Sequence, residues 1–442
     1  MKPRHLSYEQ AIAHLDSCGP GIKPDLSRMK ALVDLLDDPQ ANYPVVHVAG
    51  TNGKSTTARM TAAILAAHGL KAGVYVSPHL QSVRERFELK GLIDGAVVSS
   101  LITPDHFAEV TSYLLPFVET VESQLRSSLT YHELLTCIAF EWMTEAAVAV
   151  GVVETGLGGT WDASNVVTGQ VAVMTPIDVD HAEFLGDTPE ANAAEKAGII
   201  KQGAAVVSAA QAPGVSEVLR VAALKSGAEL AFMGDGFDLT SDDPAVGGRL
   251  VDVKGLFSSY QDVFLPLYGK HQSANLALAI AASESLLQHE LDIEAVRVSV
   301  ADMVAPARME VVSREPLVLI DGAHNPHGGK ALAEAMSTTF GARRVTAVVS
   351  MMKDKDAQGF LMHLATLADR IVLTRMAGDR AADPKELSLL PALRGIEVEV
   401  IEDLSVAIDS AIAASLDDDA VLITGSLAFA GQARDRLVGT IK

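Results

Sequence analysis

One segment of the chain has the residue types that bind a phosphate group. Residues 44–48 are mainly apolar, residues 50–53 read Gly-Thr-Asn-Gly, and Lys54, Ser55 and Thr56 follow in a stretch with helical spacing. This order predicts a strand, a tight loop and the first turn of a helix, an arrangement whose backbone N–H groups converge on one anion. Lys54 would neutralise the terminal phosphates of a nucleotide, and the hydroxyl of Ser55 or Thr56 would bind Mg²⁺.

The loop departs from the general P-loop pattern at one position, because Val48 stands where that pattern has its first glycine. The alternative is a glycine-rich turn followed by a surface lysine, with no nucleotide involved. Strand, loop and helix nevertheless fall in the order that the nucleotide interpretation needs. We therefore predict a nucleotide-binding loop at residues 50–56.

Three further polar residues, Ser77, Glu154 and His181, lie close after stretches that we predict to be strands, at residues 72–76, 147–153 and 171–175. In an open α/β sheet, ligands bind at the carboxyl ends of the strands, so these residues are expected at the same crevice as the loop. A glutamate in this place, followed by glycines, can reach a metal ion on the phosphates. The alternatives are a turn before proline for Ser77, a carboxylate that caps a turn for Glu154, and a hydrogen-bonded structural histidine for His181.

Lys196, which follows Glu195, adds an amine to the polar groups of Ser77, Glu154 and His181. A Glu-Lys pair on a helix usually lies on a solvated face, which is the alternative for these two residues. Burial would instead lower the pKa of Lys196, so that its amine could act as a nucleophile or take up CO₂ as a carbamate.

Length and pattern predict two α/β domains. At 442 residues the chain is too long for one ordinary core. We predict a P-loop NTPase-like parallel-sheet domain at residues 1–303, which includes a small β flap at about 203–268. A linker at residues 304–312 then leads to a smaller, Rossmann-like α/β domain at residues 313–442.

The second domain also places polar residues after its predicted strands, which are at residues 317–320, 345–349, 371–374, 398–401 and 421–424. Asp321 and His324 follow the first of these strands, and Ser426 follows the last. Because these are again carboxyl ends of strands, we expect ligand contacts here as well.

Composition excludes several kinds of partner. The chain has 35 lysines and arginines against 56 aspartates and glutamates, a net charge of −21. Such a surface disfavours nucleic acid and anionic membranes as partners. The two cysteines, Cys18 and Cys137, have no motif spacing, which is typical of a reducing compartment. Since no run of about 18 apolar residues is present, we predict a cytoplasmic protein without a membrane span.

Taken together, these motifs resemble the folylpolyglutamate synthase and bifunctional dihydrofolate synthase family of the Mur ligase superfamily. The resemblance extends from Gly21 to Ser426. Two positions depart from it, because Ser-Thr follows Lys54 where the family often has Gly-Ser, and Thr155 stands where a hydrophobic residue is commoner. The matching segments are residues 47–56, 77–79, 85–86, 154–159, 180–181, 195–199, 308, 321–326 and 353–356.

Carried over position by position, the resemblance implies a role for each matching residue. Catalytic roles fall to Lys54, His181 and Lys196. The implied ATP-binding residues are Thr51, Asn52, Gly53, Lys54, Ser55, Thr56, Asn275, Arg308 and Asp321. Mg²⁺, as two ions, would be held by Ser55, Ser77, Glu154, His181 and, if it is carbamylated, Lys196. The glutamate side would be formed by Arg86, His324 and Ser426.

The resemblance implies a monomeric enzyme that uses ATP to add L-glutamate to folates, and to dihydropteroate, through an acyl phosphate. One alternative is a Mur-type UDP-muramoyl ligase, but such enzymes carry a nucleotide-sugar domain before the P-loop, and about 44 residues leave no room for one. The other is a non-enzymatic nucleotide-binding switch, which would need the P-loop but has no use for Glu154, His181 and Lys196.

Overall fold

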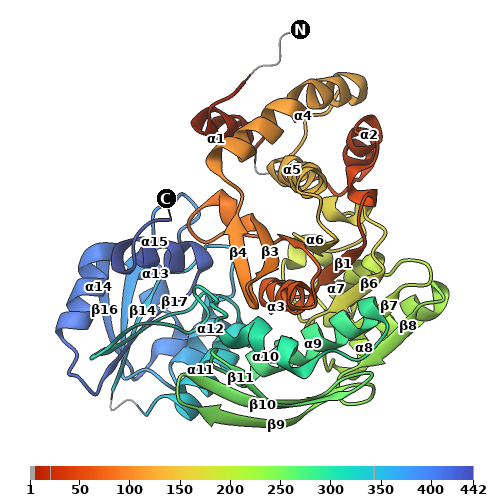
Figure 1. The fold of residues 1–442 in the computed structure, drawn as a ribbon. Helices are drawn as coiled ribbons and strands as arrows, with labels where there is room; N and C mark the ends of the chain where they lie inside the picture. The colour runs from red at the N-terminus through yellow and green to blue at the C-terminus, as the bar shows by residue number, and fades with distance from the viewer. Residues whose placement is uncertain (1–4, 20, 342–343, 442) are drawn as a thin grey trace.

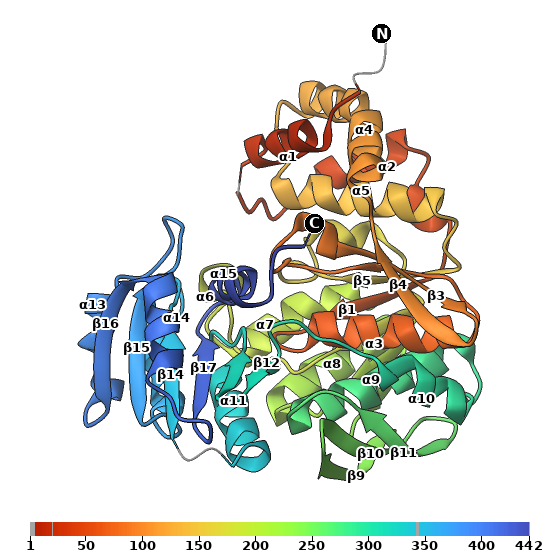
Figure 2. The same cartoon turned by 60° about the vertical axis from the view of Figure 1, so that its left-hand side comes forward.

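The computed structural model describes residues 5–19, 21–341 and 344–441 of the chain. These residues form an eight-stranded, a three-stranded and a six-stranded β-sheet, with helices around them. In Figure 1 the six-stranded sheet and its helices, in blue, lie beside the eight-stranded sheet, and the three-stranded sheet lies below in green. Figure 2 shows the two larger sheets side by side, with helices between them.

The large sheet contains β1 (Val45–Ala49), β2 (Ala72–Tyr75), β3 (Phe87–Ile93), β4 (Ala96–Leu101), β5 (Val150–Glu154), β6 (Val171–Met174), β7 (Ala205–Ser208) and β8 (Glu229–Phe232). Their order across the sheet is β4-β3-β2-β5-β1-β6-β7-β8. From β2 to β8 neighbouring strands are parallel, and β3 and β4 extend one edge as an antiparallel hairpin. Because the parallel strands end at one edge, the segments that follow β1, β2, β5 and β6 come together there.

Helices cover both faces of this sheet, because side chains along a strand alternate between the faces. Val46 and Val48 of β1 belong to a core that includes α3 (Lys54–Ala67), α9 (Lys270–Leu287) and α10 (Ile293–Ala301). Val45 belongs to the core on the other face, which α1 (Tyr8–Ser17), α2 (Ser27–Leu35), α4 (Pro104–Leu125) and α5 (Tyr131–Glu145) complete. These four helices form the group at the top of Figure 1. Three more helices follow in the chain, namely α6 (Ala182–Leu185), α7 (Pro189–Lys196) and α8 (Pro213–Lys225).

The three-stranded sheet is smaller than the flap predicted from the sequence. It consists of β9 (Asp238–Ala245), β10 (Gly248–Lys254) and β11 (Ser259–Leu265), all antiparallel. The prediction that the flap begins near residue 203 was wrong, because β7 and β8 belong to the large sheet and α8 connects them as a parallel crossover. The small sheet places Val251 and Val263 in the core that contains α9 and α10.

The six-stranded sheet contains β12 (Glu310–Arg314), β13 (Leu317–Ile320), β14 (Val345–Val349), β15 (Arg370–Arg375), β16 (Glu397–Asp403) and β17 (Ala420–Thr424). The strand order is β12-β13-β17-β14-β15-β16, and only β12 pairs in an antiparallel way. The predicted linker, residues 304–312, therefore overlaps the first strand of this sheet. The helices of this part are α11 (Pro326–Thr339), α12 (Ala357–Leu364), α13 (Pro384–Ser388), α14 (Leu404–Ala413) and α15 (Leu427–Leu437).

The predicted fold class is confirmed, since a large parallel sheet with a P-loop precedes a smaller α/β sheet. All five strands predicted in the C-terminal part are present, and those at Leu317–Ile320 and Val345–Val349 have the predicted bounds. The edge strand β12, the hairpin of β3 and β4, and α4 were not predicted. Within the described ranges, no helix combines the length and the apolar character needed to cross a membrane.

Candidate active site

The predicted phosphate loop, residues 50–53, lies between the end of β1 and the start of α3. Two of its residues must be glycine, because φ is 147° at Gly50 and 89° at Gly53. A Cβ on Gly50 would lie 1.9 Å from Thr175 Oγ1, and a Cβ on Gly53 would lie 2.5 Å from Asn275 Oδ1. The loop is thus enclosed by neighbouring segments, and α9 brings the predicted ATP residue Asn275 into direct proximity with it.

Lys54 is the first residue of α3, and its amine folds back over the loop. Its Nζ atom donates to the carbonyl oxygens of Gly50 at 3.2 Å and Thr51 at 3.3 Å. The Thr51 hydroxyl donates to the Asp178 carbonyl at 2.9 Å, which ties the loop to the segment after β6. The amine and the free N–H groups at the start of α3 therefore favour an anion beside the loop.

Glu154 joins the loop to the segment that follows β2. It is the last residue of β5, and only 1% of it is exposed. Its Oε2 atom accepts the N–H of Ser77 at 3.1 Å, and the carboxylate also has a hydrogen bond with the Ser55 side chain on α3. Burial raises the pKa of Glu154, while the charge of Lys54 and the hydrogen bond with Ser55 oppose this rise. The structure thus brings together three predicted metal ligands, namely Ser55, Ser77 and Glu154.

His181 and Lys196 lie after β6 and at the end of α7. Lys196 is 4% exposed, and burial together with the charge of Lys54 lowers its pKa to about 7. Burial also lowers the pKa of His181 to about 4, although the charge of Asp180 acts in the opposite direction. No three His, Cys, Asp or Glu side chains of the described residues form a self-contained metal site. A magnesium ion here would use oxygen atoms of phosphate and water in addition to Glu154 and His181.

A cavity of about 130 Å³ beside the loop contains predicted nucleotide residues from both sheets. The Asp321 carboxylate, just after β13, accepts the N–H groups of Met309 at 2.9 Å and Ala323 at 2.8 Å. Both hydrogen bonds hold the carboxylate in a fixed orientation. We call this space the nucleotide cavity; its lining includes Asn52, Gly53, Thr56, Asn275, Arg308 and Asp321.

Among the described residues, two polar side-chain pairs at 3.0 Å or less connect the N-terminal and C-terminal parts near the nucleotide cavity. The Nζ atom of Lys355, in the segment after β14, lies 2.9 Å from Asp180 Oδ1, and the two side chains are 12% and 17% exposed. The Nδ2 atom of Asn52 lies 3.0 Å from His327 Nδ1. Neither pairing was predicted, because each joins residues far apart in the sequence.

The three residues assigned to the glutamate side lie in different settings. The Nη1 atom of Arg86 donates to Ser77 Oγ at 3.1 Å. His324 lines the nucleotide cavity. Ser426 is 2% exposed, and its hydroxyl accepts the N–H of Ala428 at 3.2 Å, which caps α15. Their role in glutamate binding remains a prediction.

A second cavity, of about 520 Å³, has Ser77 in its lining and was not predicted. The guanidinium of Arg86 lies 5.7 Å from the centre of the Tyr131 ring, and His132 Nε2 lies 3.2 Å from Asp162 Oδ2. Tyr131 and His132 had no sequence signal of their own, because α5 reads as an ordinary buried helix. We call this space the aromatic cavity; its lining includes Ser77, Arg86, Tyr131, His132, Trp161 and His181.

A third cavity, of about 560 Å³, lies between α3, the hairpin of β3 and β4, and α10, and we call it the hairpin cavity. Three of its charged wall residues, Arg59, Glu88 and Lys90, are paired with one another. Arg59 Nε lies 3.1 Å from Glu88 Oε2, and Lys90 Nζ lies 2.6 Å from Glu88 Oε1. Burial would raise the pKa of Glu88, but the charges of Lys90 and Arg59 lower it to about 2. The other charged residues that line this cavity are Glu85, Asp302, Arg308 and Arg434.

Comparison with known proteins agrees with this geometry. The model of the Mur ligase middle domain matches residues 48–283, and that of the Mur ligase glutamate ligase domain matches residues 307–427. A dihydrofolate synthase/folylpolyglutamate synthase from Mycobacterium tuberculosis is 38% identical, covering 93% of this chain and 90% of the relative. One from Bacillus subtilis is 33% identical, covering 94% and 96%.

Solved structures give the same result. Folylpolyglutamate synthase of Mycobacterium tuberculosis complexed with ADP has a TM-score of 0.91 at 37% identity, covering 97% of this chain and 98% of that one. Escherichia coli FolC in complex with DHPP and ADP has a TM-score of 0.86 at 29% identity, covering 98% of each chain. The chain therefore belongs to the Mur ligase family, within its group of dihydrofolate synthases and folylpolyglutamate synthases.

Proposed function

We propose that this chain is an ATP-dependent ligase that adds L-glutamate to the carboxylate of a folate, and to dihydropteroate, through an acyl phosphate. The observation that supports this most strongly is the contact between Ser77 and Glu154. Ser77 lines the aromatic cavity, while Glu154 has a hydrogen bond with Ser55 at the phosphate loop. A phosphoryl group at the loop therefore lies next to an acceptor carboxylate in the cavity.

ATP occupies the phosphate loop and the nucleotide cavity in this proposal. The N–H groups of the loop and the Lys54 amine offset the charge of the triphosphate. Asn275, Arg308 and Asp321 surround the nucleoside part. The relatives from Mycobacterium tuberculosis and Escherichia coli were solved with ADP, which supports a nucleotide in this place.

The residues beside the loop fit Mg²⁺. Glu154 offers a carboxylate held by the Ser77 N–H, Ser55 offers a hydroxyl, and His181 offers an imidazole. This mixed set suits a hard cation that takes its remaining ligands from phosphate and water. When bound, Mg²⁺ offsets the charge that develops on the phosphoryl group during its transfer.

A second ion would require one more anionic ligand, and Lys196 can supply it. Because its pKa is about 7, a large fraction of its amines is neutral at physiological pH, which reaction with CO₂ requires. The amine adds to CO₂ and releases one proton, so that a carbamate replaces a buried cation. A bare amine in the intact mass of CO₂-equilibrated enzyme would contradict this assignment.

The reaction then has two steps. A carboxylate oxygen of the acceptor attacks the γ-phosphorus, and the bond to the bridging oxygen breaks as ADP leaves. The neutral amine of glutamate attacks the acyl carbon, phosphate leaves with the electron pair of the C–O bond, and the amine nitrogen loses a proton. The contact between Asp180 and Lys355 holds the two parts of the chain together, which excludes water from the acyl phosphate.

The aromatic cavity suits the pterin-bearing acceptor. The rings of Tyr131 and Trp161 and the side chain of Leu157 offer flat and apolar surface to a heteroaromatic ring. We move Arg86 from the predicted glutamate side to the acceptor, because it lines this cavity close to Ser77 and offers a guanidinium to the carboxylate end of the acceptor. The hairpin cavity is the less suitable alternative, because no tyrosine, tryptophan or phenylalanine is among the described residues that line it.

Glutamate-dependent release of phosphate from ATP tests the activity, with dihydropteroate and tetrahydrofolate supplied separately. Release with both acceptors supports the proposal in full. Release with tetrahydrofolate alone would remove dihydropteroate from it, and release with neither would overturn it.

Two variants test the place of the acceptor. Tyr131→Ala is expected to raise the KM for the acceptor by about tenfold through loss of aromatic stacking. Val97→Phe, in the hairpin cavity, is expected to leave this KM unchanged. The reverse result would move the acceptor to the hairpin cavity.

The proposal includes the organisation of the protein. One chain supplies all the residues named above, so a monomer suffices. We assign residues 1–303 and 310–442 to two domains joined by residues 304–309, because β12 begins at Glu310. Cys18 and Cys137 are both free, and we propose a cytoplasmic location for the protein.

A further inference from the structure

One wall of the aromatic cavity has no secondary structure of its own. Gly21, Ile22 and Lys23 line the cavity, but residues 21–26 form neither helix nor strand. The facing wall is the first turn of α5, which begins at Tyr131. The shape of the cavity therefore depends on what fixes residues 21–26 against α5.

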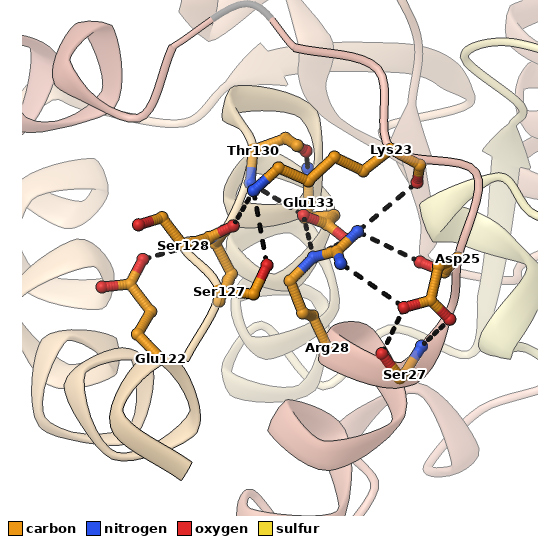
Figure 3. A network of polar contacts seen from close by, with 10 residues as sticks. Lys23, Asp25, Ser27, Arg28, Glu122, Ser127, Ser128, Thr130 and Glu133 are labelled. Carbon is orange, nitrogen blue, oxygen red and sulfur yellow. Dashed lines mark hydrogen bonds and ion pairs between the residues drawn. The ribbon is translucent and has the colours of Figure 1, made fainter. Parts of the chain in front are cut away.

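Arg28, in the first turn of α2, makes most of the connecting hydrogen bonds (Figure 3). Its Nε and Nη2 atoms both lie 3.0 Å from Glu133 Oε1, and the two side chains are 5% and 7% exposed. The Nη2 atom also donates to the carbonyl oxygens of Lys23 at 3.4 Å and Asp25 at 3.3 Å. One guanidinium thus holds the irregular segment and α5 at the same time.

Two further contacts complete this connection. The Nζ atom of Lys23 donates to the Ser128 carbonyl at 2.6 Å, across the segment that precedes α5 (Figure 3). Glu133 Oε2 accepts the N–H of Thr130 at 2.7 Å, and Thr130 Oγ1 accepts the N–H of Glu133 at 3.2 Å, which together cap α5. The partner of Arg28 is therefore itself fixed at the helix end that presents Tyr131 and His132 to the cavity.

We propose that Arg28 is a positioning residue for the pterin-bearing acceptor. It lies behind the cavity wall, and its planar guanidinium sets the distance between residues 21–26 and the first turn of α5. This inference rests on the proposed function, which places the acceptor in the aromatic cavity. Lysine cannot replace Arg28, because one ammonium group cannot bond Glu133 and two backbone carbonyls in the same fixed directions.

Arg28→Lys is the variant that tests this proposal. We expect the KM for the pterin-bearing acceptor used by the wild type to rise by about tenfold or more, as for other residues that orient a site from behind. The KM values for ATP and glutamate should stay within about twofold, because no residue of this network lines the nucleotide cavity, which contains predicted ATP residues and His324 of the predicted glutamate side. Arg249→Lys is the matched control, since Arg249 forms a buried pair with Asp242 in the three-stranded sheet.

Binding of the acceptor can be measured separately from turnover. The chain contains two tryptophans, of which Trp161 lines the aromatic cavity and Trp142 is 2% exposed in the core. The acceptor should therefore change the fluorescence of Trp161 at the same concentrations in the wild type and in Arg249→Lys. In Arg28→Lys, the same change should need an acceptor concentration about tenfold or more higher.

Each outcome has one meaning. An unchanged acceptor KM in Arg28→Lys, or an equal rise of all three KM values, would overturn the positioning role. A wild type that is active without any change in Trp161 fluorescence would also overturn it, because the acceptor would then bind elsewhere. A wild type that turns over no pterin-bearing acceptor would instead refute the proposed function.

Discussion

Replacing Lys196 by methionine is expected to stabilise the fold while abolishing turnover. Lys196 is 4% exposed at the end of α7, and burial together with the charge of Lys54 lowers its pKa from 10.5 to about 7. Since each tenfold change in proton affinity is worth about 1.4 kcal/mol, keeping this ammonium inside the protein costs up to about 5 kcal/mol. Methionine has a similar length and no charge, so the variant avoids this cost.

The size of the gain depends on pH. Below about pH 7, Lys196 is protonated in the folded and in the unfolded protein, and the wild type bears the full cost. Between about pH 7 and 10.5 the unfolded protein binds more protons than the folded one, so the stability of the wild type rises with pH. The advantage of Lys196→Met should therefore be greatest at or below pH 7 and nearly absent at about pH 10.

Urea unfolding of both proteins at about pH 7 and pH 10 measures this advantage. The buffers must lack CO₂, Mg²⁺ and nucleotide, because a carbamate would also remove the buried charge. We expect Lys196→Met to be more stable by about 2 kcal/mol or more at the lower pH, because relaxation of the surroundings reduces the full cost. Lys225→Met, at an exposed lysine on α8, is the control and should change nothing. Equal stability at pH 7, or a gain that does not vary with pH, would refute the reasoning.

Three further predictions follow from the geometry. In Gly53→Ala the new Cβ would meet Asn275, at a position where φ is 89°. The KM for ATP should therefore rise by about tenfold, while the KM for glutamate stays unchanged. An unchanged KM for ATP would contradict this prediction. Glu154→Gln keeps the volume but loses the charge, so calorimetric titration should show that Mg²⁺ no longer strengthens ADP binding; a preserved Mg²⁺ effect would exclude Glu154 as a ligand. Lys355→Met removes the contact with Asp180, so kcat should fall by about tenfold while the affinity for ADP stays the same. A kcat equal to that of the wild type would show that the contact has no role in closure.

The position of the candidate site could be inferred from the sequence because its signals are local. A glycine-rich turn followed by Lys54 predicts a phosphate loop from a few consecutive residues. The prediction for Glu154 depends only on its position at the end of an apolar strand. The five strands predicted for the C-terminal sheet could be found in the sequence for the same reason, since alternation of apolar strands with helices is a short-range pattern.

Features that depend on distant partners could not be predicted. The strands β7 and β8 are each four residues long, and only their pairing shows that they extend the large sheet. The aromatic cavity could not be predicted for the same reason, because Tyr131 and Trp161 line one cavity only after α5 packs next to the segment that follows β5. The contact between Asp180 and Lys355 joins two domains and leaves no periodic signal in either.

Isotope transfer tests the central claim, an acyl-phosphate ligase that acts on a pterin-bearing carboxylate, most directly. The acceptor is prepared with ¹⁸O in both carboxylate oxygens, and the phosphate formed with ATP and glutamate is analysed by mass spectrometry. We expect one ¹⁸O atom in each phosphate, because the oxygen that attacks the γ-phosphorus leaves with it. Unlabelled phosphate would contradict the account, since phosphate would then have been released without ever being bonded to the acceptor.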